Sequence, residues 1–182
     1  MFRLSMVLMI VALVCGLTLA LINLQTAPVI AQQKQALLER SLRAVLAADH
    51  FEKYEGTITY YEALDKDGVV LGWCLPLAAR GYGGAIQVLA GVDVTGVITG
   101  VTVLEHRETP GLGAKIVAIA AGETEPAFLK QFKGKKNDGL ILSKVKAAGS
   151  VQAITGATIS SKAVLNSVRE GVGIFLKDKL VL

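Results

Sequence analysis

Residues 85–104 read AIQVLAGVDVTGVITGVTVL, and this stretch sets the class of fold. In each half, apolar or β-branched side chains recur at every second position, which is typical of a strand with one buried face. The positions that share such a face are Ile86, Val88, Ala90 and Val92 in the first half and Val97, Thr99, Val101 and Val103 in the second. Thr95-Gly96 separates the halves as a short turn, so the stretch predicts two antiparallel strands, residues 85–94 and 97–104.

Further elements are predicted on both sides of this hairpin. Upstream, residues 57–64 (TITYYEAL) and 69–77 are β-rich and flank a turn at residues 65–68. Downstream, the patterns predict helices at residues 114–121, 125–132 and about 161–177 and a short strand at residues 140–145. The last of these helices has an apolar stripe at helical spacing, made of Val164, Val168, Val172 and Phe175. A hairpin sheet with flanking helices is typical of a single domain of the α+β class.

The N-terminal region predicts one transmembrane helix. Residues 4–24 carry no charge and, as a helix, would span about 31 Å, close to the hydrocarbon thickness of a bilayer. A cleaved signal peptide is the competing interpretation, but its apolar stretch is normally shorter and ends in a small-x-small site that this chain lacks. The predicted organisation is therefore an anchor at residues 1–25, a helical connector at residues 26–50 and a domain at residues 51–182. In the connector the chain leaves the membrane through Pro28, and a helix is predicted from about residue 35 to residue 48. Arg3 precedes the helix, which favours a cytoplasmic N-terminus and a domain on the periplasmic or extracellular side.

Charge, cysteine and histidine content argue against several other classes. The net charge of +4 is mild, and Lys130, Lys133, Lys135 and Lys136 are typical of a solvated loop, so no nucleic-acid partner is expected. Cys15 lies in the predicted anchor and Cys74 in the domain, so no internal disulfide is expected. His50 and His106 are isolated in the sequence, and we expect no protein-built metal site.

The loop at residues 154–161 (ITGATISS) is the most informative segment. It places four hydroxyls and a glycine directly before the final helix, and helix starts bind anions through their unpaired N–H groups. Gly156 would let the backbone approach a phosphate closely. The simpler interpretation is that Ser160 or Ser161 caps the helix, and composition alone favours it.

A second loop, residues 108–113 (ETPGLG), lies between the hairpin and the next helix. Pro110 fixes one φ angle, whereas Gly111 and Gly113 free their own. A loop of this shape either binds a ligand or makes a tight connection. No general base, nucleophilic pair or paired carboxylates emerge from the spacing, so no catalytic residue is predicted.

Taken together, these motifs resemble a known family along essentially the whole chain. The matching segments, in order, are the anchor, LINLQTAPVI at residues 21–30, GYGG at residues 81–84, the strand pair, HRETPGLGAKI at residues 106–116 and ITGATISSKAV at residues 154–164. With them the chain resembles the G subunit of Rnf-type ion-translocating electron transport complexes. It is also similar, less closely, to the C subunit of sodium-pumping NADH:quinone oxidoreductases.

The resemblance implies a covalent flavin. In that family the last threonine of the [ST]-G-A-T motif, here Thr158, carries FMN through a phosphoester bond. By the same resemblance, Thr155, Gly156 and Ala157 shape the attachment loop, and Ser160 and Ser161 open the helix beneath the phosphate. Glu108, Thr109, Leu112 and Gly113, with Tyr82 from the GYGG loop, are then expected to contact the flavin ring, and Lys144 matches a basic position of the family. One position departs from the family pattern: Gln152 stands where an acidic residue, read by the flavin-transferring enzyme, is usual.

The implied function is a one-electron relay in a membrane-bound ferredoxin:NAD oxidoreductase that translocates ions. The implied partners are a polytopic flavin-bearing subunit, iron–sulfur subunits and, for maturation, a flavin transferase. The redox activity would belong to the whole complex, with no independent catalysis by this subunit. Two alternatives stay open at this point: a membrane-tethered FMN-binding module of another respiratory or regulatory system, and a structural assembly factor whose loops are only turns.

Overall fold

The computed structural model describes residues 2–56, 58–143, 145 and 149–180. The chain divides into two compact units, residues 1–39 and residues 40–182. The first unit lies within helix α1, Phe2–Val45, whose remaining residues belong to the second unit. Among the described residues, α1 is the one helix long and apolar enough to cross a membrane, and its apolar window is not buried in the protein.

Helix α1 continues through Pro28, whereas the sequence predicted that the chain leaves the anchor there and starts a new helix near residue 35. A proline removes one backbone N–H, and its ring crowds the carbonyl four residues earlier, but it does not oblige the chain to unwind. The residues that follow Pro28 are mostly good helix formers, including Ala31, Gln32 and Gln33. The propensity of these neighbours therefore outweighs the local cost of the proline.

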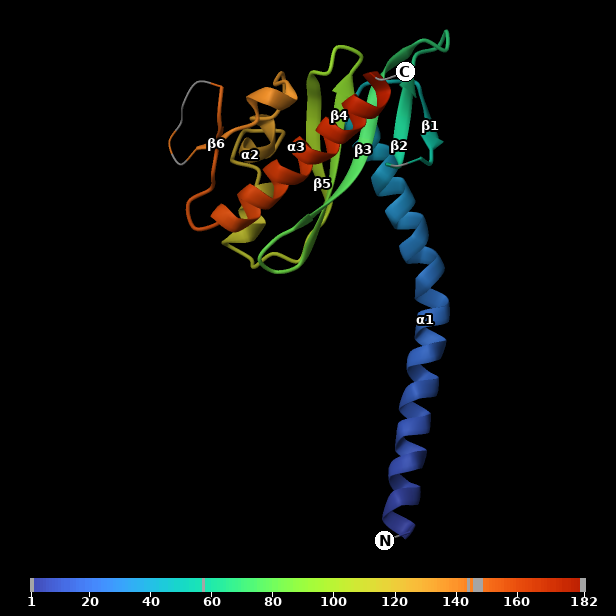
Figure 1. Cartoon of the computed structure of the whole chain (residues 1–182). Coiled ribbons are helices and arrows are strands. Elements are labelled where there is room, and N and C mark those ends of the chain that lie inside the picture. The colour runs from blue at the N-terminus through green and yellow to red at the C-terminus, as the bar shows by residue number, and fades with distance from the viewer. Residues whose placement is uncertain (1, 57, 144, 146–148, 181–182) are drawn as a thin grey trace. The chain divides into compact units, whose positions relative to one another are not determined.

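The second unit contains the predicted antiparallel sheet (Figure 1). Its strand order is that of the chain: β1 His50–Tyr54, β2 Tyr60–Leu64, β3 Val70–Arg80, β4 Ala85–Asp93 and β5 Ile98–Glu105. The predicted hairpins are confirmed, although β2 begins later than expected and Thr57 lies outside the described residues. Strand β1 was not predicted, because its sequence HFEKY is largely polar and the strand is mostly exposed at the edge of the sheet.

The alternation predicted for the second half of the hairpin is wrong at its start. Gly91 pairs with Gly100, but Val92 pairs with Ile98, so Thr99 is an extra residue on β5. A bulge of this kind exchanges the two faces of a strand, because side chains alternate with a period of two residues. Ile98 and Val101 therefore both enter the core, in place of the predicted alternation.

The remaining elements are short, except for the last helix. They are η1 Gly113–Val117, α2 Ala127–Lys130, η2 Asn137–Gly139, the parallel pair β6 Leu142–Ser143 and β7 Val151–Gln152, and α3 Thr158–Leu180. The two predicted middle helices are thus reduced to one or two turns. Helix α3 crosses one face of the sheet and packs on β3 and β4 (Figure 1).

The core lies between α3 and the sheet. The predicted stripe on α3 is confirmed: Val164, Val168, Val172 and Phe175 are all buried. A Cβ atom at Gly171 would lie 2.3 Å from Cδ2 of Leu77, which shows how closely the helix approaches β3. Cys74 is buried in the sheet, where burial raises the pKa of its thiol to about 12, and neither cysteine forms a disulfide.

The end of α1 is fastened to the sheet within the second unit. Val45 is buried, and its carbonyl accepts a hydrogen bond of 2.8 Å from the hydroxyl of Thr99. At Gly91, a Cβ atom would lie 2.4 Å from Cγ1 of Val45 and 2.5 Å from Oγ1 of Thr99. Glycine at this position therefore allows the helix end to reach the sheet.

We predict that Gly91→Ala destabilises the domain by about 1–3 kcal/mol, the cost typical of overpacking a filled site. The measurement is chemical unfolding of the full chain in detergent, followed by the fluorescence of its single tryptophan, Trp73. Gly139→Ala is the matched control, because a Cβ atom there meets nothing within 4 Å. Equal unfolding free energies for the two variants would contradict the packing described for Val45.

Candidate functional site

Three loops meet around one cavity of about 420 Å³. They are the loop at residues 81–84, the ETPGLG loop at residues 108–113 and the loop at residues 154–157 that leads into α3. The residues that line the cavity are Tyr82, Glu108, Thr109, Leu112, Gly113, Gly156, Ala157, Thr158, Ile159 and Ser160. All of them except Ile159 belong to the set predicted to bind the cofactor. The fold therefore brings together loops that are about 75 residues apart in the sequence.

The loop before α3 is a tight turn. The N–H of Ala157 donates to the carbonyl of Ile154 at 3.0 Å, and Gly156 has φ of 80°, a left-handed conformation that favours glycine. The buried Ser161 hydroxyl donates to the carbonyl of Ala157 at 2.9 Å and accepts from the N–H of Ile154 at 3.1 Å. Both ends of the turn are thus held by one side chain of the following helix.

Helix α3 begins at Thr158, directly after this turn. Its first backbone bond runs from the N–H of Ser161 to the carbonyl of Ala157, at 3.0 Å. Among the described residues, none accepts a hydrogen bond from the N–H of Thr158, Ile159 or Ser160. These three donors, together with the helix macrodipole, form an electropositive helix start beside the cavity.

Thr158 is the exposed hydroxyl at this helix start. Within the described part of the chain its hydroxyl has no hydrogen-bond partner, in contrast to the hydroxyls of Ser160 and Ser161. The prediction that Ser160 or Ser161 caps the helix is wrong, as is the expectation that these serines open it. Both lie inside the first turn and are buried, because the turn ends three residues earlier than composition suggested.

The ETPGLG loop is a second tight turn. The N–H of Leu112 donates to the carbonyl of Thr109 at 3.2 Å, and Pro110 and Gly111 occupy the two central positions. Gly111 has φ of 77°, as predicted, whereas Gly113 does not adopt a left-handed conformation. Gly113 serves another purpose, since a Cβ atom there would lie 2.1 Å from Oε2 of Glu108.

Glu108 is buried at the junction of the three loops, with 6% of its surface exposed. Its Oε1 accepts from the backbone N–H of Gly83 at 3.0 Å, and its Oε2 accepts from the hydroxyl of Ser160 at 2.6 Å. Its own N–H donates to Nδ1 of His106 at 3.3 Å. Glu108 therefore links the loop at residues 81–84 to the start of α3.

The mouth of the cavity is apolar and exposed. Tyr82, Leu112 and Ile159 are each at least half exposed, which is unusual for such large apolar side chains in one place. Ile159 was missed by sequence reasoning, because an apolar residue in the first turn of a helix is ordinarily assigned to the core. Thr155 lies in the turn without lining the cavity, and Lys144 lies outside the described residues.

Gln152, the position that departs from the family pattern, lies on β7, and its backbone groups form two hydrogen bonds with the side chain of Gln131. Its N–H donates to Oε1 of Gln131 at 2.7 Å, and its carbonyl accepts from Nε2 of Gln131 at 3.3 Å. The side-chain amide of Gln131 thus acts as an additional backbone partner for this short strand. No sequence pattern pointed to this role, because it depends on a contact across 21 residues.

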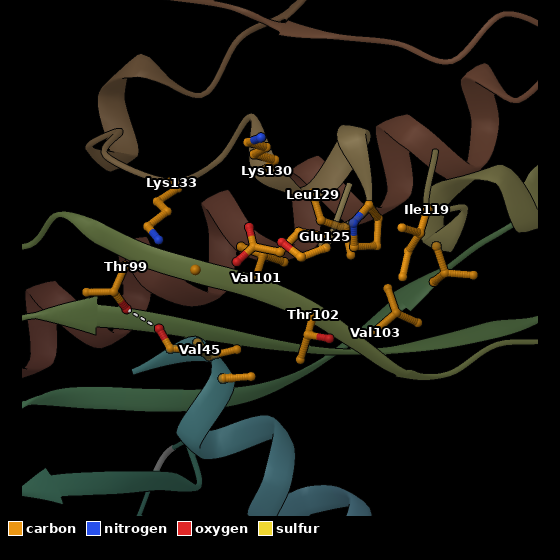
Figure 2. A pocket seen from close by; sticks show the side chains of 15 residues that line it. Val45, Thr99, Val101, Thr102, Val103, Ile119, Glu125, Leu129, Lys130 and Lys133 are labelled. Atoms are coloured by element: carbon orange, nitrogen blue, oxygen red, sulfur yellow. Dashed lines mark hydrogen bonds between the residues drawn. The ribbon is translucent and has the colours of Figure 1, made fainter. Parts of the chain in front are cut away.

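A second cavity, of about 300 Å³, lies beside strand β5 (Figure 2). Figure 2 shows the hydrogen bond from Thr99 to the carbonyl of Val45 among the lining residues, with Lys133 drawn above Thr99 in this view. Lys130, at the same cavity, is paired with Glu123 at 2.9 Å. None of the residues predicted to bind the cofactor lines this cavity, so the site at α3 is the better candidate.

The fold and the site match a class of flavin-binding domain. The family model of the FMN-binding domain matches residues 81–173, which include every residue that lines the cavity at α3. A second family model, the RnfG N-terminal region, matches residues 1–45. The C subunit of a Na⁺-translocating NADH-quinone reductase from Parabacteroides distasonis has a similar fold, with a TM-score of 0.52 and 29% identity over 66% of this chain and 61% of that one.

Relatives that match nearly the whole chain identify its family more narrowly than the domain match does. The G subunit of a proton-translocating ferredoxin:NAD⁺ oxidoreductase complex from Clostridium ljungdahlii is 35% identical over 94% of this chain and 89% of its own length. The G subunit of the Na⁺-translocating complex from Acetobacterium woodii is 32% identical over 96% and 91%. The chain belongs to this family, the G subunits of Rnf-type ion-translocating oxidoreductase complexes. Together with the apolar helix α1, family membership identifies a single-pass membrane protein.

We predict that Ser161→Ala destabilises the domain by about 1–3 kcal/mol, because it leaves the partly buried N–H of Ile154 without a partner. Ser167→Ala, on the same helix, removes only a local bond to the carbonyl of Val164 and is the matched control. Its expected effect is below about 0.5 kcal/mol. Unfolding of the full chain in detergent measures both, and a control that loses as much stability as Ser161→Ala would refute the role given to this hydroxyl.

Proposed function

We propose that this protein is an electron-carrying subunit of a ferredoxin:NAD⁺ oxidoreductase complex and that it holds FMN covalently through a phosphoester to Thr158. The observation that carries the proposal is the hydroxyl of Thr158, which is exposed beside a cavity at a helix start where, among the described residues, the N–H groups of Thr158, Ile159 and Ser160 have no acceptor. The relatives named above are subunits of complexes with this activity. The remaining alternatives, a tethered FMN module outside such a complex and an assembly factor, have no observation of their own in their favour.

The chemistry of the cavity suits FMN. A phosphodiester on Thr158 keeps one negative charge, and the free N–H groups at the start of α3 are the donors that such an anion needs. Among the described residues that line the cavity, none has a positively charged side chain, and the helix start supplies positive potential there. The exposed apolar surface of Tyr82, Leu112 and Ile159 offers a flat ring system a place to bury its faces.

We assign the ring contacts on this basis. Leu112 and Tyr82 provide apolar surface, and the side chain of Thr109 and the backbone of Gly113 provide polar groups for the ring edge. Thr155, Gly156 and Ala157 shape the attachment turn. Lys144 stays a proposal that rests on the family resemblance alone.

Attachment requires an activated donor. The hydroxyl oxygen of Thr158 would form the new bond to the phosphorus of FMN and lose its proton, while the phosphoanhydride bond of the donor breaks and releases the donor's other phosphate-bearing part. A flavin transferase would supply this donor and recognise the loop. Ser160 and Ser161 are buried and donate their protons inside the protein, so among the hydroxyls of residues 154–161 Thr158 is the one that is both exposed and lines the cavity.

Bound FMN would accept and release electrons one at a time, and the residues of this chain would orient it and shield it from solvent. No proton-transferring side chain is needed for this role. The proposed partners in the complex are a polytopic subunit with its own flavin and iron–sulfur subunits. We further propose an anchor at residues 1–25, a connector at residues 26–50 and an FMN-binding domain at residues 51–182 on the periplasmic or extracellular side.

We predict that Thr158→Ala abolishes covalent flavin, whereas Thr155→Ala retains it, because Thr155 does not line the cavity. Each chain is co-expressed with a flavin transferase, denatured and separated on a gel, and flavin fluorescence of the band is recorded under ultraviolet light. A fluorescent Thr158→Ala band, or a dark wild-type band, would contradict the assignment.

We also predict that Gln152→Glu raises the fraction of flavin-bearing chain when the transferase is limiting. The substitution restores an acidic side chain six residues before Thr158 and leaves both backbone bonds to Gln131 in place. Absorbance of flavin relative to protein measures the fraction, with Gln131→Glu as a control that perturbs the same strand from the other side. A fraction equal to or below the wild-type value would show that the transferase does not read this position.

A further inference from the structure

We propose that Glu108 is a positioning residue: its buried carboxylate fixes the three loops in the one arrangement that presents Thr158 to the cavity. The inference rests on the proposed FMN site and deepens it. It differs from the expectation that Glu108 contacts the flavin ring, because each carboxylate oxygen is already engaged within the protein.

The two donors to the Glu108 carboxylate lie on two separate segments of the chain. One is the backbone N–H of Gly83, next to Tyr82 at the cavity mouth, and the other is the hydroxyl of Ser160, two residues after Thr158. Glu108 itself belongs to the ETPGLG loop, which supplies the rest of the lining. A single side chain thus joins all three loops, and the bond to Ser160, at 2.6 Å, has the length of a charge-assisted hydrogen bond.

Two glycines leave space for this carboxylate. A Cβ atom at Gly81 would lie 2.1 Å from Oε1 of Glu108, and one at Gly113 would lie 2.1 Å from Oε2. The φ angle of neither glycine is in the left-handed region, so the reason for glycine here is room and not backbone conformation. The two glycines lie on different loops and enclose the same group from two sides.

Loss of the Glu108 carboxylate acts on the loops rather than on the core. Truncation leaves the N–H of Gly83 and the buried hydroxyl of Ser160 without their acceptor, and such groups are costly inside a protein. The loops then lose their shared partner, although the sheet and the core of α3 do not involve Glu108. The effect should therefore concentrate on flavin attachment and on local opening of the loops.

Three variants at position 108 separate the effect of the side chain's reach from the effect of its negative charge. Glu108→Gln keeps the reach: its oxygen can accept from Gly83 while its amide donates to the oxygen of Ser160. Glu108→Asp keeps the charge but is one methylene too short to meet both donors. Glu108→Ala removes both properties, and Glu170→Ala, an exposed carboxylate on α3, is the control.

The experiment measures flavin content in the full chain and hydrogen exchange in a Thr158→Ala background, which carries no flavin. Positioning predicts that Glu108→Gln keeps most of the flavin content, whereas Glu108→Asp and Glu108→Ala lose most of it. It also predicts that the amide of Gly83 exchanges roughly tenfold faster in the Asp and Ala variants, as expected for a lost hydrogen bond. The exchange of core amides in β4 reports whether each variant remains folded.

The outcomes are distinct. Flavin content that is retained by Asp and lost by Gln would show that charge matters and would overturn the proposal, as would wild-type flavin content and wild-type exchange in Glu108→Ala. A wild-type chain without flavin would refute the proposed function, and hydrogen exchange at Gly83 would still decide the role of Glu108. If Glu108→Ala fails to fold, the comparison of Gln with Asp decides alone.

A double variant gives an independent check. Gly81→Ala should lower flavin content because the new methyl group collides with Glu108. In the Glu108→Ala background the collision with Glu108 is gone and the contact with Cδ1 of Ile86, at 2.7 Å, remains, so adding Gly81→Ala should lower the flavin content by a smaller factor than in the wild-type background. Equal fold-losses from Gly81→Ala in both backgrounds would contradict the close packing around this carboxylate.

Discussion

Two hydrogen bonds to the carbonyl of Ala157, from the N–H and the hydroxyl of Ser161, fix the residue at which α3 begins. The rest of the site depends on that start. Because the helix begins at Thr158, this threonine is exposed while the two serines that follow turn inward. A start three residues later, as capping by Ser160 or Ser161 would require, would leave Thr158 in a loop without the unpaired N–H groups of a helix beside it.

The sheet supplies the rigid support for this arrangement. Strand β5 leads into the ETPGLG loop, and α3 rests on β3 and β4 through a continuous apolar stripe. The carboxylate of Glu108 then ties the loops together above this support. Mobile loops would orient a bound cofactor poorly, and orientation of the cofactor is the main contribution of the protein to electron transfer.

Much of this organisation could be predicted from the sequence because it depends on the spacing of residues that are close together in the chain. The alternation of residues 85–94, the stripe on α3 and the two glycine-containing loops all follow from spacing. The predictions that were wrong concern features that depend on contacts between segments distant in the sequence. The bulge at Thr99 goes with the hydrogen bond from its hydroxyl to the carbonyl of Val45. The burial of Ser160 goes with the hydrogen bond from its hydroxyl to Glu108, 52 residues earlier. Neither partner is visible in a window of neighbouring residues, and a family resemblance names the site without explaining its geometry.

We propose a membrane-anchored chain whose helix start carries a flavin for electron transfer within a larger complex. Its central claim concerns one covalent bond, so the most direct measurement is peptide mass spectrometry of the wild-type chain purified from its native membrane. The account predicts that the peptide containing Thr158 carries the mass of FMN less one water, with the fragment ions placing it on Thr158. An unmodified peptide, or the same mass on Thr155, Ser160 or Ser161, would contradict it.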